Sequence, residues 1–128
     1  MTFAAVLFLT ACGSGKPDPI AGCNASQNGI LWISWTLGGQ TADSNACSGV
    51  SSLSIIGMPT GEAGCGFMIS MVKCDRGTTP FEYDYLPEGD TNIEIDALAS
   101  DGSELKRGTA FVHITPTKPA QAIPVDLR

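Results

Sequence analysis

The chain has 128 residues, 43% of them hydrophobic, and a net charge of −6, which suits one small globular domain. All 13 acidic and all 7 basic residues follow Cys12, so the region after this cysteine carries the whole net charge. An acidic region without a basic stripe repels phosphate backbones, and we therefore expect no nucleic-acid partner. Anionic lipid headgroups would repel it for the same reason.

The N-terminal segment is apolar but short. Residues 2–9 are far fewer than the ~20 apolar residues of a membrane-spanning helix, and they are typical of the apolar region of a secretory signal peptide. The run Leu9-Thr10-Ala11-Cys12 resembles the bacterial lipobox, in which a signal peptidase cleaves before the cysteine. The resemblance implies that residues 1–11 are a signal peptide and that Cys12 carries acyl chains such as palmitate. Such chains would hold the protein on a membrane.

Two interpretations of this segment remain open. Only Met1-Thr2 precedes the apolar run, without the usual Lys or Arg, so either the signal peptide starts upstream or this is a buried strand with an ordinary core cysteine. The polar residues after Cys12 favour the lipoprotein, and we expect residues 12–29 to be the lipidated cysteine and a flexible tether. Gly13 is not the Asp that retains enteric lipoproteins in the inner membrane. The resemblance therefore implies the bacterial outer membrane, facing the periplasm or the cell surface.

After the tether, apolar residues alternate with a period of two, which is typical of strands, and no stretch keeps a helical stripe for three turns. Strands are predicted in ILWISWTL, VSSLSIIG, GFMISMVKC, FEYDYL, TNIEIDALA, GTAFVHIT and QAIPVDL. The side chains expected to share one face of their strand are Leu31, Ile33, Trp35 and Leu37; Leu53 and Ile55; Phe67, Ile69 and Met71; Phe81, Tyr83 and Tyr85; and Ile93, Ile95, Ala97 and Ala99.

Turn residues separate these strands. Gly89 in PEGD can adopt positive φ, and Asp101-Gly102 is a strong hairpin signal. Pro124 has no N–H to donate, so its strand should lie on an edge or be interrupted there. Seven short strands in about 100 residues predict an all-β fold, a single antiparallel β-sandwich over residues 30–128.

Four cysteines follow Cys12, and an even number in a small exported domain predicts two disulfides. None has the C-x2-C spacing of a metal site, so we expect no metal. Cys65 and Cys74 flank an extended strand and lie about 30 Å apart, too far to pair with each other. If the second and third strands are antiparallel neighbours, Cys47 lies near Cys74 and Cys65 near Cys23. The predicted disulfides are therefore Cys47–Cys74 and, less directly, Cys23–Cys65.

The second half of the chain resembles a known family of sandwiches. The turn Leu86-Pro87-Glu88-Gly89, the alternating Ile93-Glu94-Ile95 and the hairpin Asp101-Gly102 are similar to transthyretin-like, or carboxypeptidase-regulatory-like, domains. The region after Cys12 also resembles small Ig-like bacterial lipoproteins of unassigned function. The resemblance implies the fold and the cell address, and it assigns no catalytic residue.

Candidate chemistry is sparse. His113 is the single histidine, and because no G-x-S-x-G motif accompanies it we interpret it as a satisfied or exposed strand residue rather than part of a Ser-His-Asp site. The pairs Glu82/Asp84 and Glu94/Asp96 each share a strand face and could flank a glycosidic bond or bind a cation. The favoured alternative is a solvated face that discourages edge pairing.

Aromatic residues offer a different kind of site. Trp32, Tyr83 and Tyr85 could stack on sugars if one sandwich face displayed them. The favoured alternative is that Phe81, Tyr83 and Tyr85 face inward as core and that Trp32 is exposed. We expect no catalytic residue and no cofactor. The sequence favours a non-catalytic, lipid-anchored cell-envelope protein that serves as a structural or protein-interaction module. The alternative is a surface carbohydrate-binding module.

Overall fold

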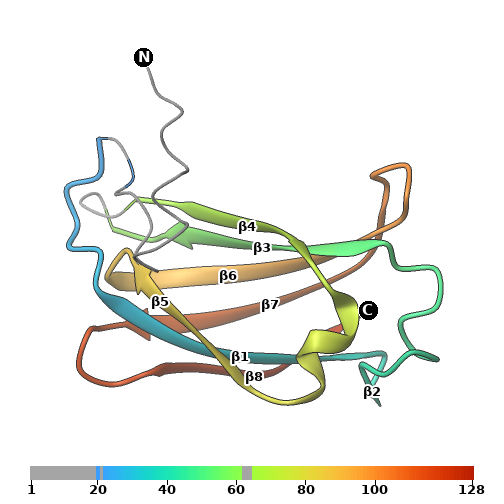
Figure 1. The fold of residues 1–128 in the computed structure, drawn as a ribbon. Coiled ribbons are helices and arrows are strands. Elements are labelled where there is room, and N and C mark those ends of the chain that lie inside the picture. Colours follow the sequence, from blue (N-terminus) through green and yellow to red (C-terminus); the bar gives the residue numbers. More distant parts are fainter. Residues whose placement is uncertain (1–19, 21, 62–64) are drawn as a thin grey trace, which may run out of the picture.

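The computed structural model describes residues 20, 22–61 and 65–128, and it shows two four-stranded sheets packed face to face (Figure 1). The predicted signal peptide, the lipobox with Cys12, and the tether as far as residue 19 lie outside the described residues. Within the described ranges, no helix is long and apolar enough to cross a membrane.

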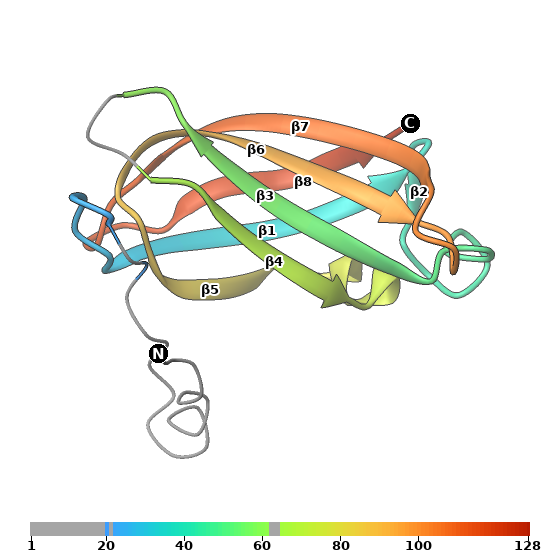
Figure 2. The same cartoon turned by 90° about the horizontal axis from the view of Figure 1, so that it is seen from above.

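Each sheet consists of four strands, and Figure 2 shows the two layers from above. The strands of the first sheet are β1 (Gly29–Leu37), β2 (Gln40–Thr41), β5 (Phe81–Leu86) and β8 (Ala120–Leu127). Those of the second, in the spatial order β4-β3-β6-β7, are β3 (Ser52–Pro59), β4 (Phe67–Val72), β6 (Gly89–Leu98) and β7 (Glu104–Ile114). A short 3-10 helix, η2 (Cys74–Thr78), connects β4 to β5 and so links the two sheets.

The predicted all-β sandwich is confirmed, with two differences in its strands. The described residues form eight strands where seven were expected, because the two-residue β2 pairs with the end of β1. The expectation that all strands are antiparallel is wrong for β8, which runs parallel to β1. After β7 the chain crosses from the second sheet to the first. β8 therefore does not form an antiparallel hairpin with the strand before it and can lie parallel to β1. The pairing register between β1 and β8 shifts opposite Pro124. This irregularity agrees with the interruption expected there, because proline has no N–H to donate.

Strand β1 runs through the centre of the core. Its alternation is confirmed, since Leu31, Ile33, Trp35 and Leu37 are all buried. They pack against buried residues of the second sheet, among them Leu53, Ile55, Ile93 and Ile95. Backbone hydrogen bonds in both directions between Arg107 and Arg128 join β7 to β8 and close one side of the sandwich.

Strands β4 and β5 each contain one residue that breaks the predicted alternation. Met71 has φ 61° and Tyr85 has φ 60°, and the pairing register shifts in both strands. An inserted bulge residue reverses which face of the sheet the later side chains of the strand point to. Val72 and Leu86 therefore point into the core, where an unbroken alternation would have placed Met71 and Tyr85. The expectation that Met71 shares a face with Phe67 and Ile69, and Tyr85 with Phe81 and Tyr83, is therefore wrong.

Both predicted disulfides are confirmed. Cys47–Cys74 has Cα atoms 5.9 Å apart, and Cys23–Cys65 has them 5.4 Å apart. The second bridge ties the segment before β1 to the segment before β4. The N–H of Glu88 also donates to the carbonyl of Ser26 at 2.8 Å. The last residues of the expected tether thus lie against the sandwich.

Candidate functional site

Trp32 lies on the outer face of the first sheet. Its neighbours in β1, Leu31 and Ile33, point into the core, and the Trp32 side chain is 39% exposed. The indole Nε1 donates to Oε1 of Glu82 at 3.0 Å, across the β1–β5 pairing. This hydrogen bond is the main reason why the pKa of Glu82 lies below its usual value, and a hydrogen bond with Asp84 adds to the effect. Glu82 is therefore an ionised acceptor at neutral pH.

The pair Glu82 and Asp84 is in direct contact. Their mutual hydrogen bond is the main cause that raises the pKa of Asp84, followed by burial and by the charge of Glu82. Carboxyl groups that flank a glycosidic bond stand about 5 Å or more apart. Two groups that share a hydrogen bond are too close for that task, so the pair forms a polar surface beside Trp32.

The structure does not bring the three predicted ligand-binding aromatics together. Tyr83 pairs with Leu31 and lies on the inner side of β5, half-buried, where burial raises its pKa. Its ring meets that of Phe81 edge to face, with centroids 5.2 Å apart. Tyr85 is exposed at the bulge. Trp32 and Tyr83 consequently occupy opposite faces of the first sheet.

Gln121 is a neighbour of Trp32 that the sequence did not reveal. It pairs with Trp32 in the parallel β1–β8 ladder and is exposed. The side chains of directly paired residues share a face, so Gln121 lies on the opposite side of Trp32 from Glu82. The sequence carries no signal for this, because the partner of the last strand depends on the path of the chain.

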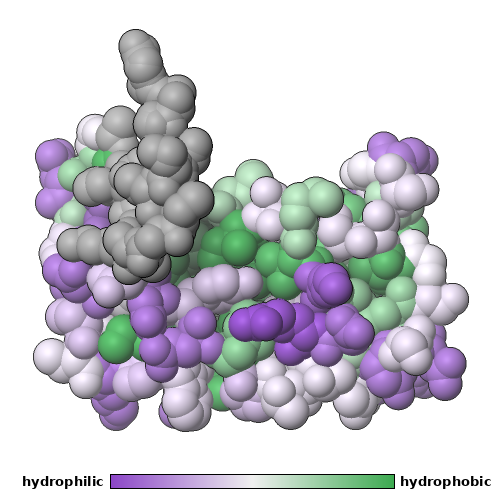
Figure 3. All heavy atoms as spheres, viewed as in Figure 1, coloured by the Kyte–Doolittle hydropathy of each residue, from purple (hydrophilic) through white to green (hydrophobic). Residues whose placement is uncertain are grey.

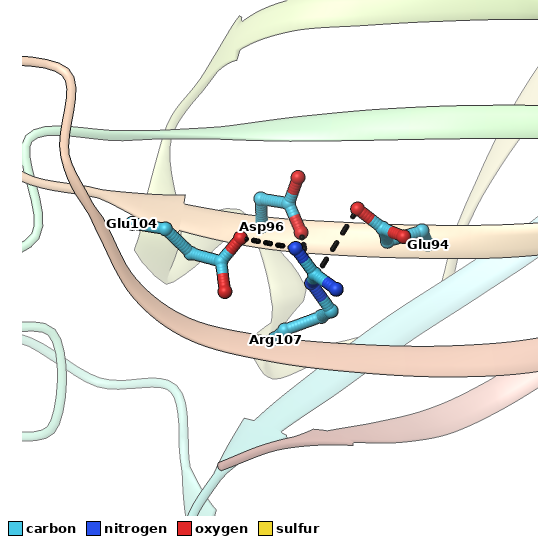
Figure 4. Close-up of polar contacts among 4 residues, drawn as sticks. All are labelled: Glu94, Asp96, Glu104 and Arg107. Carbon is cyan, nitrogen blue, oxygen red and sulfur yellow. Dashed lines mark hydrogen bonds and ion pairs between the residues drawn. The ribbon is translucent and has the colours of Figure 1, made fainter.

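The second acidic pair, Glu94 and Asp96, surrounds an arginine (Figure 4). Nε of Arg107 lies 3.5 Å from Oε2 of Glu94 and 3.3 Å from Oδ1 of Asp96, and its Nη2 donates to Glu104 at 2.6 Å. Burial, followed by the hydrogen bond with Asp96, raises the pKa of Glu94. The guanidinium already occupies the position that a cation would take between these carboxylates. The described ranges contain no group of three or more His, Cys, Asp or Glu placed to hold a metal ion.

His113 lies on the outer side of β7 and contacts Asp90 of β6, its cross-strand partner. Both side chains are more than half exposed, so this is a surface pair rather than an oriented base in a closed pocket. The imidazole also lines a cleft of about 510 Å³ between β7 and β8, together with Phe111, Lys118 and Gln121.

The edge of the second sheet is strongly apolar. β4 lies at one end of that sheet, and its sequence FMISMV contains no charged residue. Met68 and Met71 are 65% and 80% exposed. Met58 of the neighbouring β3 is also exposed and lies two residues beyond Ile56, the partner of Met68. Figure 3 shows hydrophobic surface along and just below β4, and strongly hydrophilic surface where η2 lies in Figure 1. We call Met58, Met68 and Met71 the methionine edge.

Comparison of the chain with protein-family models, curated proteins and solved structures finds no match. The similarity of residues 86–115 to transthyretin-like sandwiches therefore stays a prediction from the turn and strand pattern. A function for this chain has to follow from its own surfaces and charges.

Proposed function

We propose that the chain is a non-catalytic, lipid-anchored cell-envelope protein whose sandwich binds a protein partner along β4. The observation that carries this proposal is an outermost strand with no charge and two largely exposed methionines. Exposed apolar side chains that lie together on a soluble domain mark interaction surfaces. Methionine suits this role because its flexible side chain adapts to different partner shapes.

The two outer strands that η2 connects differ in how they discourage pairing. β5 carries Glu82 and Asp84, and charges of this kind prevent one sheet edge from joining another. β4 has only the bulge at Met71. The outward backbone N–H and C=O groups of β4 can therefore accept an extended segment of a partner, with apolar contacts to the methionine edge.

Charge narrows the identity of the partner. A second copy would bring another −6 to the interface, and like charges raise the cost of association. We therefore infer a different protein, with an extended apolar segment that is neutral or flanked by Lys and Arg.

The proposed anchor places the methionine edge close to a membrane. Cys23 is bonded to Cys65, which directly precedes β4, and eleven residue steps lead from Cys12 to Cys23. A fully extended chain of that length reaches at most about 40 Å. Acyl chains on Cys12 would thus hold the start of β4, next to Cys65, within roughly this distance of the outer membrane, so the partner is itself an envelope protein.

Site-specific photo-crosslinking in the native host tests the partner. A photoreactive residue at Met68 or Met71 should give the same adduct, and one at Leu105, an exposed residue of β7, should not. The double change Met68→Lys and Met71→Lys should abolish co-purification of that partner. An equal adduct from Leu105, no adduct at either methionine, or an adduct only with a second copy would overturn the proposal.

Intact-mass analysis of protein from host membranes tests the anchor. We expect loss of residues 1–11 and an added diacylglycerol with further acylation, and Cys12→Ser should release the protein from the membrane fraction. Recovery of the unprocessed chain with an unmodified Cys12 would contradict this part of the proposal.

A further inference from the structure

Three strands place a continuous row of side chains on the outer face of the first sheet. Trp32 of β1 pairs with Glu82 of β5 on one side and with Gln121 of β8 on the other. All three side chains are exposed, while the flanking Leu31 is fully buried. An indole thus lies between a carboxylate and an amide. This row is on a different sheet from the methionine edge.

The central indole is held in place. Its Nε1 hydrogen bond to Glu82 limits ring rotation, so little side-chain freedom is left to lose when a ligand covers the ring. The same bond orients Glu82, whose carboxylate also interacts with Asp84 and keeps lone pairs that can accept further hydrogen bonds. Gln121 offers both a carbonyl acceptor and an amide donor.

The dimensions and chemistry of the row match a sugar ring. Neighbouring strands lie about 4.8 Å apart, so the backbone positions of Glu82 and Gln121 are separated by about 10 Å. The apolar C–H face of a pyranose packs on an aromatic ring, and its hydroxyl groups extend sideways as donors and acceptors. Polar groups on both sides of the indole can meet those hydroxyls.

A cleft continues from one end of the row. Gln121 also lines the cleft of about 510 Å³ between β7 and β8, whose walls include the exposed ring of Phe111 and the amine of Lys118. A second sugar unit bound beyond Gln121 would enter this cleft. The carboxylates of Glu82 and Asp84 at the other end disfavour an anionic ligand over Trp32.

We propose that Trp32, Glu82 and Gln121 form a binding site for a neutral oligosaccharide, with the adjoining cleft accepting the next sugar unit. The site goes beyond the proposed protein interaction, because the row lies on the other sheet, the cleft borders β7 at the opposite end of the second sheet from β4, and different side chains are used.

An array of neutral and anionic oligosaccharides, probed with the detergent-solubilised full chain, tests this site. We expect binding to neutral oligosaccharides, weakened about tenfold or more by Trp32→Ala and by a smaller factor in Gln121→Ala and Glu82→Ala. Trp32→Phe keeps a ring but loses the bond to Glu82, so its affinity should lie between those of the wild type and Trp32→Ala. Leu105→Ser removes an exposed apolar side chain elsewhere and should bind like the wild type.

Several outcomes would overturn the site: no binding to any arrayed saccharide, preference for anionic ones, or equal binding by Trp32→Ala and the wild type. A loss as large in Leu105→Ser would do the same. Gln121→Ala and Trp32→Phe keep the test decisive if Trp32→Ala fails to fold. Crosslinking from Met68 should persist in Trp32→Ala, so either proposal can fail without the other.

Discussion

The indole Nε1 of Trp35 donates to the backbone carbonyl of Cys74 at 2.8 Å, and this hydrogen bond is buried. It connects the central strand β1 with η2 at the point where the Cys47–Cys74 disulfide enters. The same ring meets Phe81 edge to face, with centroids 5.6 Å apart. One tryptophan therefore fixes the segment that carries the chain from the second sheet to the first.

Replacing Trp35 by Phe should destabilise the fold. The change removes the N–H and leaves the carbonyl of Cys74 buried without that donor, which costs about 1–3 kcal/mol in addition to the loss of ring volume. Urea unfolding followed by circular dichroism measures the free energy. Trp32→Phe is the matched control, because its indole is partly exposed. Equal losses in both variants would contradict the role of the buried bond.

Gly77 should not tolerate a side chain. A Cβ at this position would lie 2.2 Å from the ring of Trp35, and the surrounding core prevents the ring from moving away. We expect Gly77→Ala to lower the free energy of unfolding by about 1–3 kcal/mol, as overpacking does. Gly61→Ala is the control, since a Cβ there has no atom within 4 Å. An unchanged urea midpoint for Gly77→Ala would show that η2 can shift.

The two disulfides should differ in their effect on stability. Cys47–Cys74 spans 27 residues and Cys23–Cys65 spans 42. If each disulfide acted only by restricting the unfolded chain, the two would contribute nearly equally to the free energy of unfolding, about 2–4 kcal/mol each. Cys74 is buried in the core, however, and Cys23 is not. The double change Cys47→Ala and Cys74→Ala should therefore lower the free energy of unfolding more than Cys23→Ala and Cys65→Ala. Calorimetry of both double variants measures this, and the reverse order would contradict it.

Asp126 should make stability depend on acid pH. Its Oδ1 accepts from the Thr36 hydroxyl and from the N–H of Gly39, both at 2.7 Å, and Oδ2 meets Arg128. These contacts, led by Thr36, hold the pKa of Asp126 below its usual value. The folded state then binds the proton less tightly than the unfolded state, so this stabilisation is present above about pH 4 and lost as pH falls through the lower folded pKa.

We therefore expect Asp126→Ala to be less stable than the wild type at pH 7 and the difference to shrink as the pH falls below about 4. Urea unfolding at a series of pH values measures it. Asp75→Asn, an exposed change in η2, is the control. A difference that stays constant from pH 7 to pH 2 would refute the charge-dependent role of Asp126.

Alternation in the sequence was sufficient to predict the buried sides of β1, β3 and β6, because strands with one side in the core reveal their register directly. The disulfide pairing also followed, since an extended strand sets the distance between the cysteines that flank it. The outward orientation of Met71 and Tyr85 was not predicted, because a single bulge residue reverses the alternation of inward and outward side chains without a clear sequence signal.

The candidate site was less predictable for a related reason. The exposure of Trp32 could be expected from its place between inward residues. Its partners Glu82 and Gln121, and the arginine that neutralises Glu94 and Asp96, depend on cross-strand register and on the parallel placement of β8. Such neighbours are set by the tertiary path, which alternation does not encode.

The parallel partnership between the first and last strands has a consequence for biogenesis. Because β1 needs β8 as its neighbour on one side, the first sheet cannot be completed until residues 120–127 have emerged, about 80 residues after β1. A chain translocated from its N-terminus would stay incompletely folded while it is threaded through a narrow export channel. For the exported protein proposed above, the first sheet would be completed late, after translocation into a compartment where thiols are oxidised.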